Sequence, residues 1–359
     1  MTENFQYTLK RHDSSKDKSL RAWSAADEYI LQRFLSIEKS AKHLTIYNDR
    51  FGYLACQLHA QKPTLILCNK SQEKAINLNL KAHHLHKLNF ANPLSSLENK
   101  MDFATIKIPK SLALFQLFLE HIVNNSTDDV VVVTGFMTRH FSPRILEIAE
   151  MYFEEAEQSK ALKKARLLVL SKKKQPAKLD LTTSVSYKDS TYRQYPGVFS
   201  ADHIDYATQA LLEHLEIKES DQRILDLASG NGVIGHQIQQ QLPKAEIHLM
   251  DDFYLAVESA KLNIKGDNVH HHFNNDLSIF EDDSFDLIVS NPPFHFEYEI
   301  NIQIPIQLFK ESARCLKKGG SLQLVANKHL NYRVHLEPLF SSVENVTEGE
   351  KFIVYKCVK

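Results

Sequence analysis

The strongest constraint on the fold is the alternation of short apolar runs with helix-like stretches in the second half of the chain. Five runs have the length and composition of strands: 222–227, 245–250, 285–290, 321–326 and 352–358. Apolar residues have helical spacing at 255–264 and 305–316, between successive runs. This alternation is typical of βαβ units and predicts a mainly parallel sheet covered by helices.

The first half repeats the same order more weakly. The run 65–69 followed by 75–81 corresponds to 247–251 followed by 259–265, and 103–109 corresponds to 285–292. We therefore predict two tandem Rossmann-like α/β domains from a duplication, although all doubly wound domains share this rhythm. The predicted boundaries are 1–178 for the first domain, 179–195 for a linker or hairpin, and 196–359 for the second.

Charge is distributed unevenly over a chain whose net charge is only −1. Residues 1–180 have a net charge of +8, and residues 181–359 have a net charge of −9. A basic half suggests contact with a polyanion such as nucleic acid, although surface charge can also drift by chance.

Location and redox state follow from what the sequence lacks. No apolar run approaches the roughly 20 residues that span a bilayer, and residues 1–18 have no signal-peptide h-region. The four cysteines form no Cys-x-x-Cys pair, which argues against a zinc ribbon and fits a reducing compartment. We expect a cytoplasmic protein, monomeric and without a membrane partner.

Lysines and an arginine crowd the segment 160–174 around a strand-like run at 167–170. One interpretation is a solvated edge strand protected by lysines. The other, which we favour, is a patch that contacts RNA phosphates. The candidate RNA-binding residues are Lys163, Lys164, Arg166, Lys172, Lys173 and Lys174.

The turn after the run 222–227 reads Asp226-x-Ala228-x-Gly230-x-Gly232 and precedes a helix. Glycines at such a turn allow a ligand to approach the backbone closely. A carboxylate at the strand end would repel a pyrophosphate, but it suits S-adenosylmethionine, which carries an ammonium and a sulfonium. Ser229 and Asn231 complete the predicted cofactor turn.

Two later positions extend the predicted cofactor site. Asp251 ends the next strand, where an acid binds ribose hydroxyls in doubly wound sheets, although it could instead cap the following helix. Asn275 and Asp276 follow the expected third strand and could bind the adenine amine, or form an ordinary polar loop. The first half has Asn69 in place of Asp251, so we expect only the second domain to hold the cofactor.

Asn291-Pro292-Pro293-Phe294 follows the strand 285–290 and is the sharpest motif in the chain. The prolines fix two φ angles, so the Pro292 carbonyl is held rigid. With the Asn291 side-chain oxygen it offers two acceptors to one planar NH₂ group. Phe294 offers a face for base stacking. Together with the Asp226 turn and Asp251, the motif predicts a methyltransferase that acts on an exocyclic amine.

Three adjacent histidines, His270 to His272, could suggest a metal site. Adjacent side chains on a strand point to opposite faces, and the sequence shows no spaced Cys, His or Glu partner. We therefore predict surface histidines and no metal.

These blocks resemble the bacterial ribosomal RNA guanine-N2 methyltransferases, most closely the large-subunit (23S rRNA) methyltransferase G family. The resemblance is carried by Leu20–Leu31, Lys163–Arg166, Gly197–Ser200, Asn231–Gly235, Asn291–His295 and Val325–Tyr332. It implies two methyltransferase-like domains, with S-adenosylmethionine bound only by the second, and one guanine of 23S rRNA as substrate. By the same resemblance, the Asn291 motif would hold the guanine.

One residue departs from the family pattern. Ala228 stands where the family usually has the first glycine of this turn. If that position needs a positive φ, alanine costs about 1 kcal/mol there and weakens cofactor affinity. Two alternatives stay open: the same reaction on a 16S rRNA guanine, and a non-catalytic RNA-binding or ribosome-assembly module.

Overall fold

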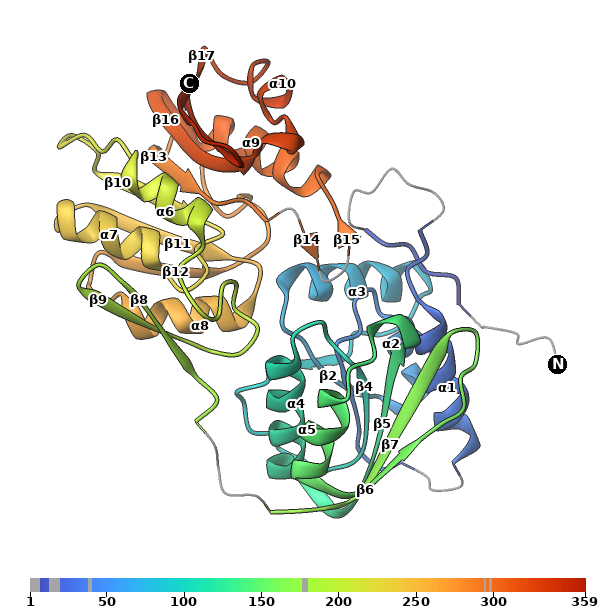
Figure 1. Ribbon diagram of the computed structural model, residues 1–359. Helices are drawn as coiled ribbons and strands as arrows, with labels where there is room; N and C mark the ends of the chain where they lie inside the picture. The colour runs from blue at the N-terminus through green and yellow to red at the C-terminus, as the bar shows by residue number, and fades with distance from the viewer. Residues whose placement is uncertain (1–6, 13–19, 38–40, 176–179, 294, 297–298) are drawn as a thin grey trace. The chain divides into compact units, whose positions relative to one another are not determined.

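The computed structural model describes residues 7–12, 20–37, 41–175, 180–293, 295–296 and 299–359. The chain divides into two compact units, residues 1–181 and 182–359 (Figure 1). Each unit contains one seven-stranded sheet. No helix of the described residues is long and apolar enough to cross a membrane.

The second unit has the strand order β12-β11-β10-β13-β16-β18-β17. Its strands are β10 (Arg223–Leu227), β11 (Glu246–Asp251), β12 (Val269–Phe273), β13 (Phe285–Ser290), β16 (Leu316–Asn327), β17 (Ser342–Glu348) and β18 (Phe352–Val358). The pairs are parallel from β12 to β16, whereas β18 runs antiparallel to both β16 and β17.

Helices cover both faces of this sheet (Figure 1). They are α6 (Tyr206–Glu213), α7 (Val233–Gln241), α8 (Tyr254–Asn263), α9 (Gln303–Cys315) and α10 (Arg333–Leu336). Alternate residues of β10 serve the two faces, as the pleat requires. Ile224 packs in the core with α6, α7 and α8, and Leu225 packs in the core with α9 and α10.

The first unit has the order β3-β2-β1-β4-β5-β7-β6, which is the same pattern of crossovers. Its strands are β1 (Leu44–Tyr47), β2 (Thr64–Ile66), β3 (Asn89–Ala91), β4 (Met101–Lys107), β5 (Ser126–Met137), β6 (Phe153–Gln158) and β7 (Ala165–Lys173). Its helices are α1 (Ala25–Ser36), α2 (Tyr53–Gln57), α3 (Lys70–Ala82), α4 (Leu112–Asn125) and α5 (Arg144–Tyr152).

A shared irregularity supports duplication more strongly than strand order alone. Between β4 and β5 the register moves from Met101↔Ser126 to Phe103↔Val131. Between β13 and β16 it moves from Phe285↔Leu316 to Leu287↔Ser321. Residues 317–320 lie within the bounds of β16 and make up this irregular pairing, with Gly319 at a φ of +78°.

Between the two sheets in sequence lies an antiparallel hairpin, β8 (Thr183–Tyr187) and β9 (Ser190–Gln194). It falls within the second unit and packs against α8. Two further strands, β14 (His295–Phe296) and β15 (Glu299–Ile300), pair after the Asn-Pro-Pro motif. The predicted two-domain Rossmann-like fold is confirmed. The order of the strands reverses between β10 and β13, where ligands of open α/β sheets bind.

Candidate active site

The loop from β10 to α7 has a left-handed backbone at three positions. Ala228 has φ of +61°, Gly230 +55° and Gly232 +82°. A side chain at Gly232 would have its Cβ 3.1 Å from the Cβ of Ala260 and 3.2 Å from Leu249. Gly230 faces open space, with no heavy atom within 4 Å of the Cβ position. The loop is therefore tightly packed at Gly232 and open at Gly230.

Asp226 is buried at the end of β10. Its Oδ2 accepts a hydrogen bond of 2.8 Å from the Gly235 backbone N–H, whereas its Oδ1 has no partner among the described residues. Burial raises the pKa of Asp226 to about 7. A buried carboxylate oxygen without a donor is costly in the free protein, so this position favours a ligand that carries positive charge or N–H groups.

Asp251 connects the same loop to β11. Its Oδ2 accepts from the Gly230 N–H at 2.9 Å, and its Oδ1 accepts from the Phe253 N–H at 2.8 Å. Burial raises its pKa to about 6. Phe253, not Asp251, is the N-cap of α8. Each carboxylate oxygen retains acceptor capacity, which fits the predicted contact with ribose hydroxyls.

The other predicted cofactor residues divide into two groups. Ser229 Oγ and Asn275 Oδ1 are buried without partners in the described part of the chain, so both have capacity for a ligand. Asn231 and Asp276 instead support the protein. The Asn231 amide donates to Gln194 Oε1 at 2.7 Å, and Asp276 accepts from the Ser278 N–H at 3.2 Å.

These observations test whether the edge formed by β10, β11 and β12 fits S-adenosylmethionine. Three buried oxygens at this edge have no partner among the described residues: Asp226 Oδ1 at the end of β10, Ser229 Oγ in the loop after it, and Asn275 Oδ1 after β12. The carboxylates Asp226 and Asp251 lie at the ends of β10 and β11. Gly230, whose Cβ position has no heavy atom within 4 Å, lies in the loop after β10 and leaves the backbone there open to a ligand. The residues present therefore fit a ligand with an ammonium, ribose hydroxyls and an adenine amine.

Asn291 follows β13, which pairs directly with β10. The Ser290 hydroxyl donates to the Leu227 carbonyl at 2.7 Å and fixes the tips of the two strands together. The fold thus places Asn291 beside the loop between β10 and α7, as the sequence predicts. Pro292 is buried and Pro293 is exposed. Phe294 lies outside the described residues.

A small pocket of about 60 Å³ opens at Asn291 and Pro292. Its wall includes Phe199, Asp205, Asn327 and Tyr332. Phe199 is a large apolar side chain that is 67% exposed at this pocket. An exposed aromatic ring beside rigid acceptors is suited to stacking on a nucleobase.

Sequence reasoning missed two residues of this pocket region. Asp205 and Thr208, at the start of α6, both accept hydrogen bonds from the Asn291 side-chain amide. An Asp before an apolar helical run is an N-cap signal, and this would have found the helix start. No local pattern links it to a residue 86 positions later.

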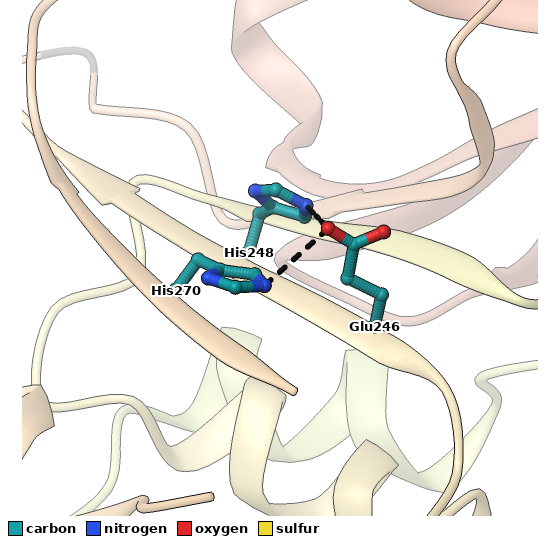
Figure 2. A group of neighbouring side chains, drawn as sticks. All are labelled: Glu246, His248 and His270. Atoms are coloured by element: carbon teal, nitrogen blue, oxygen red, sulfur yellow. Dashed lines mark hydrogen bonds and ion pairs between the residues drawn. The ribbon is translucent and has the colours of Figure 1, made fainter. Parts of the chain in front are cut away.

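The histidine prediction needs correction. His270 does face two partners on the neighbouring strand: Glu246 Oε1 lies 3.3 Å from His270 Nε2 and 3.0 Å from His248 Nε2 (Figure 2). These three ligand atoms lie within 4.8 Å of one another, close enough for a metal ion. Arg223 already places a cation there, however, with its Nε 3.3 Å from Glu246 Oε2 and 3.2 Å from His248 Nε2. His248 is buried and the three adjacent histidines are half-buried, so they are not surface histidines, and burial lowers the pKa of His248 to about 4.

The basic segment is not one continuous patch. Lys163 and Lys164 precede β7 and Lys172, Lys173 and Lys174 end it, so the two groups lie roughly 25 Å apart along an extended strand. Lys173 is 7% exposed and donates to the Ser126 carbonyl at 2.9 Å, which corrects its predicted RNA role. Lys172 pairs with Glu155, Lys174 donates to the Glu150 carbonyl, and the Arg166 Nε is buried. Lys164 is exposed.

The corresponding loop of the first unit, between β1 and α2, uses its carboxylate in hydrogen bonds within the loop and the start of α2. Asn48 has φ of +57° and stands four residues before Gly52, as Ala228 stands four before Gly232. Asp49 then accepts from the N–H groups of Gly52, Tyr53 and Ala55 at 2.8–3.1 Å. Ile46 occupies the place of Asp226. The carboxylate of this loop is therefore used in internal hydrogen bonds.

Comparison with known proteins gives a consistent result for both units. The model of the RLMG N-terminal domain matches residues 1–176, and that of the methyltransferase small domain matches residues 189–356. Ribosomal RNA large subunit methyltransferase G of Psychromonas ingrahamii is 30% identical over 98% of this chain and 96% of its own length. The protein of the same name from Serratia proteamaculans is 31% identical over 99% and 96%.

Among solved structures, a T. thermophilus 16S rRNA N2 methyltransferase in complex with AdoMet and guanosine has a TM-score of 0.78. The similarity covers 94% of this chain and 92% of that chain at 20% sequence identity. At this identity the similarity concerns the fold, and it includes both units.

Proposed function

The chain belongs to the ribosomal RNA large subunit methyltransferase G family, and from this we propose that it methylates the exocyclic N2 amine of one guanine in 23S rRNA. S-adenosylmethionine supplies the methyl group as a substituent on a sulfonium sulfur. In the overall reaction an N–C bond forms, the S–C bond breaks with its electron pair left on sulfur, and N2 loses one proton to solvent. The observation that carries the proposal is the position of Asn291 at the tip of β13, beside the loop that follows β10.

The protein's own residues supply binding and orientation. Asp226, Ser229 and Asp251 offer acceptors to the cofactor at the β10 and β11 ends. Asn291 Oδ1 and the carbonyl of Pro292 would accept the two N2 protons, which aims the nitrogen lone pair along one line. Catalysis by this arrangement is positioning, together with acceptors next to a nitrogen that becomes positive in the transition state.

Base access sets a further requirement. A paired or stacked guanine cannot reach a pocket at a strand tip, so the target base must leave its stack at a cost of a few kcal/mol. Phe199, exposed at the pocket, offers a stacking surface that offsets part of this cost.

The test is methyl transfer to 23S and 16S rRNA from cells that lack this protein, with N2-methylguanine mapped in both. We expect one new methylated guanine in 23S rRNA. Asn291→Ala should lower the rate at least about 100-fold, the scale of losing an oriented donor or acceptor at a reacting centre, while S-adenosylmethionine still binds. Asn345→Ala on β17 is the matched control. Modification of 16S rRNA alone, or full turnover by Asn291→Ala, would contradict the proposal.

A further inference from the structure

The side-chain amide of Asn291 is held from one side before any substrate arrives. Its Nδ2 donates to Asp205 Oδ2 at 3.2 Å and to Thr208 Oγ1 at 3.0 Å. Both acceptors belong to the first turn of α6 or its cap. The two contacts account for both N–H groups of the amide.

These contacts also decide which end of the amide faces the ligand. A carboxylate can only accept hydrogen bonds, so the nitrogen of Asn291 and not its oxygen must face Asp205. The oxygen, Oδ1, has no partner among the described residues and is therefore the end presented to a substrate. Without Asp205, the amide could flip and present N–H groups, which repel an amine donor.

Asp205 itself has acceptor capacity to spare. Its Oδ2 caps α6 by accepting from the N–H groups of Ala207 at 3.1 Å and Thr208 at 3.4 Å, in addition to the Asn291 contact. No partner of its Oδ1 is found in the described part of the chain. Asp205 is half-buried and lines the pocket together with Asn291 and Pro292. A carboxylate oxygen and an amide oxygen thus border the same small space.

We propose that Asp205 is a specificity-determining residue: it orients the Asn291 amide through Oδ2 and accepts the N1–H of the target guanine through Oδ1. This rests on the proposed guanine-N2 function. Guanine presents two adjacent donors, N1–H and the N2 amine, and the pocket presents two adjacent acceptors. A purine that has the 2-amine but a lone pair at N1 would place that lone pair against the carboxylate.

The energetic consequence is discrimination at the base edge. A hydrogen bond to an ionised acceptor is shorter and about twice as strong as a neutral one. A site built to bind a polar group rejects an analogue that lacks it by up to about 10⁴-fold, because the buried partner is left unpaired. Asp205 would therefore select guanine over 2-aminopurine and 2,6-diaminopurine, although all three carry the reacting amine.

The experiment uses the full-length protein and a 23S rRNA fragment that contains the mapped target guanine. The fragment is synthesised with guanine, 2-aminopurine or 2,6-diaminopurine at that position, and kcat/KM is measured for each. We expect the wild-type protein to prefer guanine by at least about 100-fold. Asp205→Asn retains a capping side chain but replaces either the free oxygen or the anchoring oxygen with an amide NH₂ group. Guanine turnover should therefore fall, and the preference should shrink at least tenfold.

Controls separate this proposal from failure of folding or of the proposed function. Asp202→Asn changes an exposed carboxylate three residues earlier and should leave the preference intact. Calorimetry with S-adenosylmethionine should give unchanged affinity for Asp205→Asn, which shows that the cofactor site is folded. If wild-type protein methylates guanine but also accepts 2,6-diaminopurine equally, or if Asp205→Asn slows all substrates by one common factor, the N1 contact is overturned while the proposed function stands. Absence of guanine methylation by the wild-type protein contradicts the proposed function itself.

Discussion

Ala228 is an alanine at a backbone position whose conformation favours glycine. Its φ of +61° lies in the left-handed region, so the condition set by the sequence argument is met. The backbone N–H of Ala228 donates to the Met250 carbonyl at 2.8 Å, which fixes this conformation. The first unit solves the same problem with Asn48, a residue type that tolerates a positive φ better than alanine.

Replacement of Ala228 by glycine should stabilise the protein. Relief of the left-handed strain is expected to add about 1 kcal/mol to the free energy of unfolding, reduced slightly by the greater entropy of glycine in the unfolded chain. Urea denaturation measures it. Ala210→Gly in the middle of α6 is the control, and it should destabilise by a similar amount because glycine is a poor helix former. A loss of stability for Ala228→Gly would show that the strain argument is wrong.

Asp226 makes the pH dependence of stability testable. Burial raises its pKa to about 7 in the folded protein, above its value of roughly 4 in the unfolded chain. The raised pKa means that protonation stabilises the fold: this contribution is fully present below about pH 4 and is lost as the pH rises through 7.

Asp226→Asn should therefore be more stable than the wild-type protein at pH 8, by roughly 4 kcal/mol, and nearly equal at pH 4. The same variant should bind S-adenosylmethionine more weakly, because the free oxygen that fits a cationic ligand has lost its charge. Thermal unfolding at the two pH values and calorimetry measure both effects. Equal stability differences at pH 4 and pH 8 would contradict the buried-carboxylate account.

Sequence patterns predicted well which candidate site residues lie near one another, where each residue ends or follows a strand. Asp226, Asp251 and Asn291 each end or follow a strand of one parallel sheet, so their proximity follows from topology alone. Asp205 and Thr208 act on Asn291 through a packing of α6 against the sheet, and no periodicity in the sequence encodes that contact. Glu246 reaches His270 for a similar reason: strand register, which a single sequence does not reveal, brings the two together.

At the level of elements, β7 changes the interpretation of the basic segment. An extended strand separates its two ends, so charges that are close in sequence form two groups in space. The lysines at the carboxyl end anchor β7 to neighbouring segments, as Lys173 does at Ser126. Lys172 and Lys174 are exposed but engaged, with Glu155 and with the Glu150 carbonyl. Before β7, Lys163 Nζ lies 3.1 Å from Glu28, and Lys164 is exposed.

Charge reversal at the two ends should therefore have different results. Lys164→Glu should weaken rRNA binding and reduce the slope of log K against log salt by about 1, with the unfolding midpoint unchanged. Lys173→Glu should instead destabilise the first unit by a few kcal/mol, because it buries a carboxylate against carbonyl oxygens. Filter binding at several salt concentrations and thermal unfolding separate the two. An unchanged salt slope for Lys164→Glu would indicate that this end does not contact RNA.

Over the whole molecule, the two units share one architecture but differ in the polar groups that they leave free at the strand ends. Both sheets share strand order and the same register irregularity. The second copy retains a carboxylate with an unsatisfied oxygen, whereas the first directs Asp49 at its own helix N-terminus. The alternation of apolar runs predicted the fold of both copies, because that pattern depends only on burial. Whether a copy offers a buried carboxylate at this strand end depends on a single residue, Ile46 or Asp226, and the two positions could be matched only after the fold was assumed.

The shared role of Asp205, as helix cap and as anchor of Asn291, makes accuracy sensitive to heat. The first turn of a short helix frays at temperatures where the rest of a sheet-based fold is intact. Fraying there would release the amide to rotate while the cofactor loop still holds its shape. If Asp205 selects the base as proposed, we expect warming to weaken that selection before the fold unfolds, so that methylation of wrong bases sets the upper temperature at which the protein is useful.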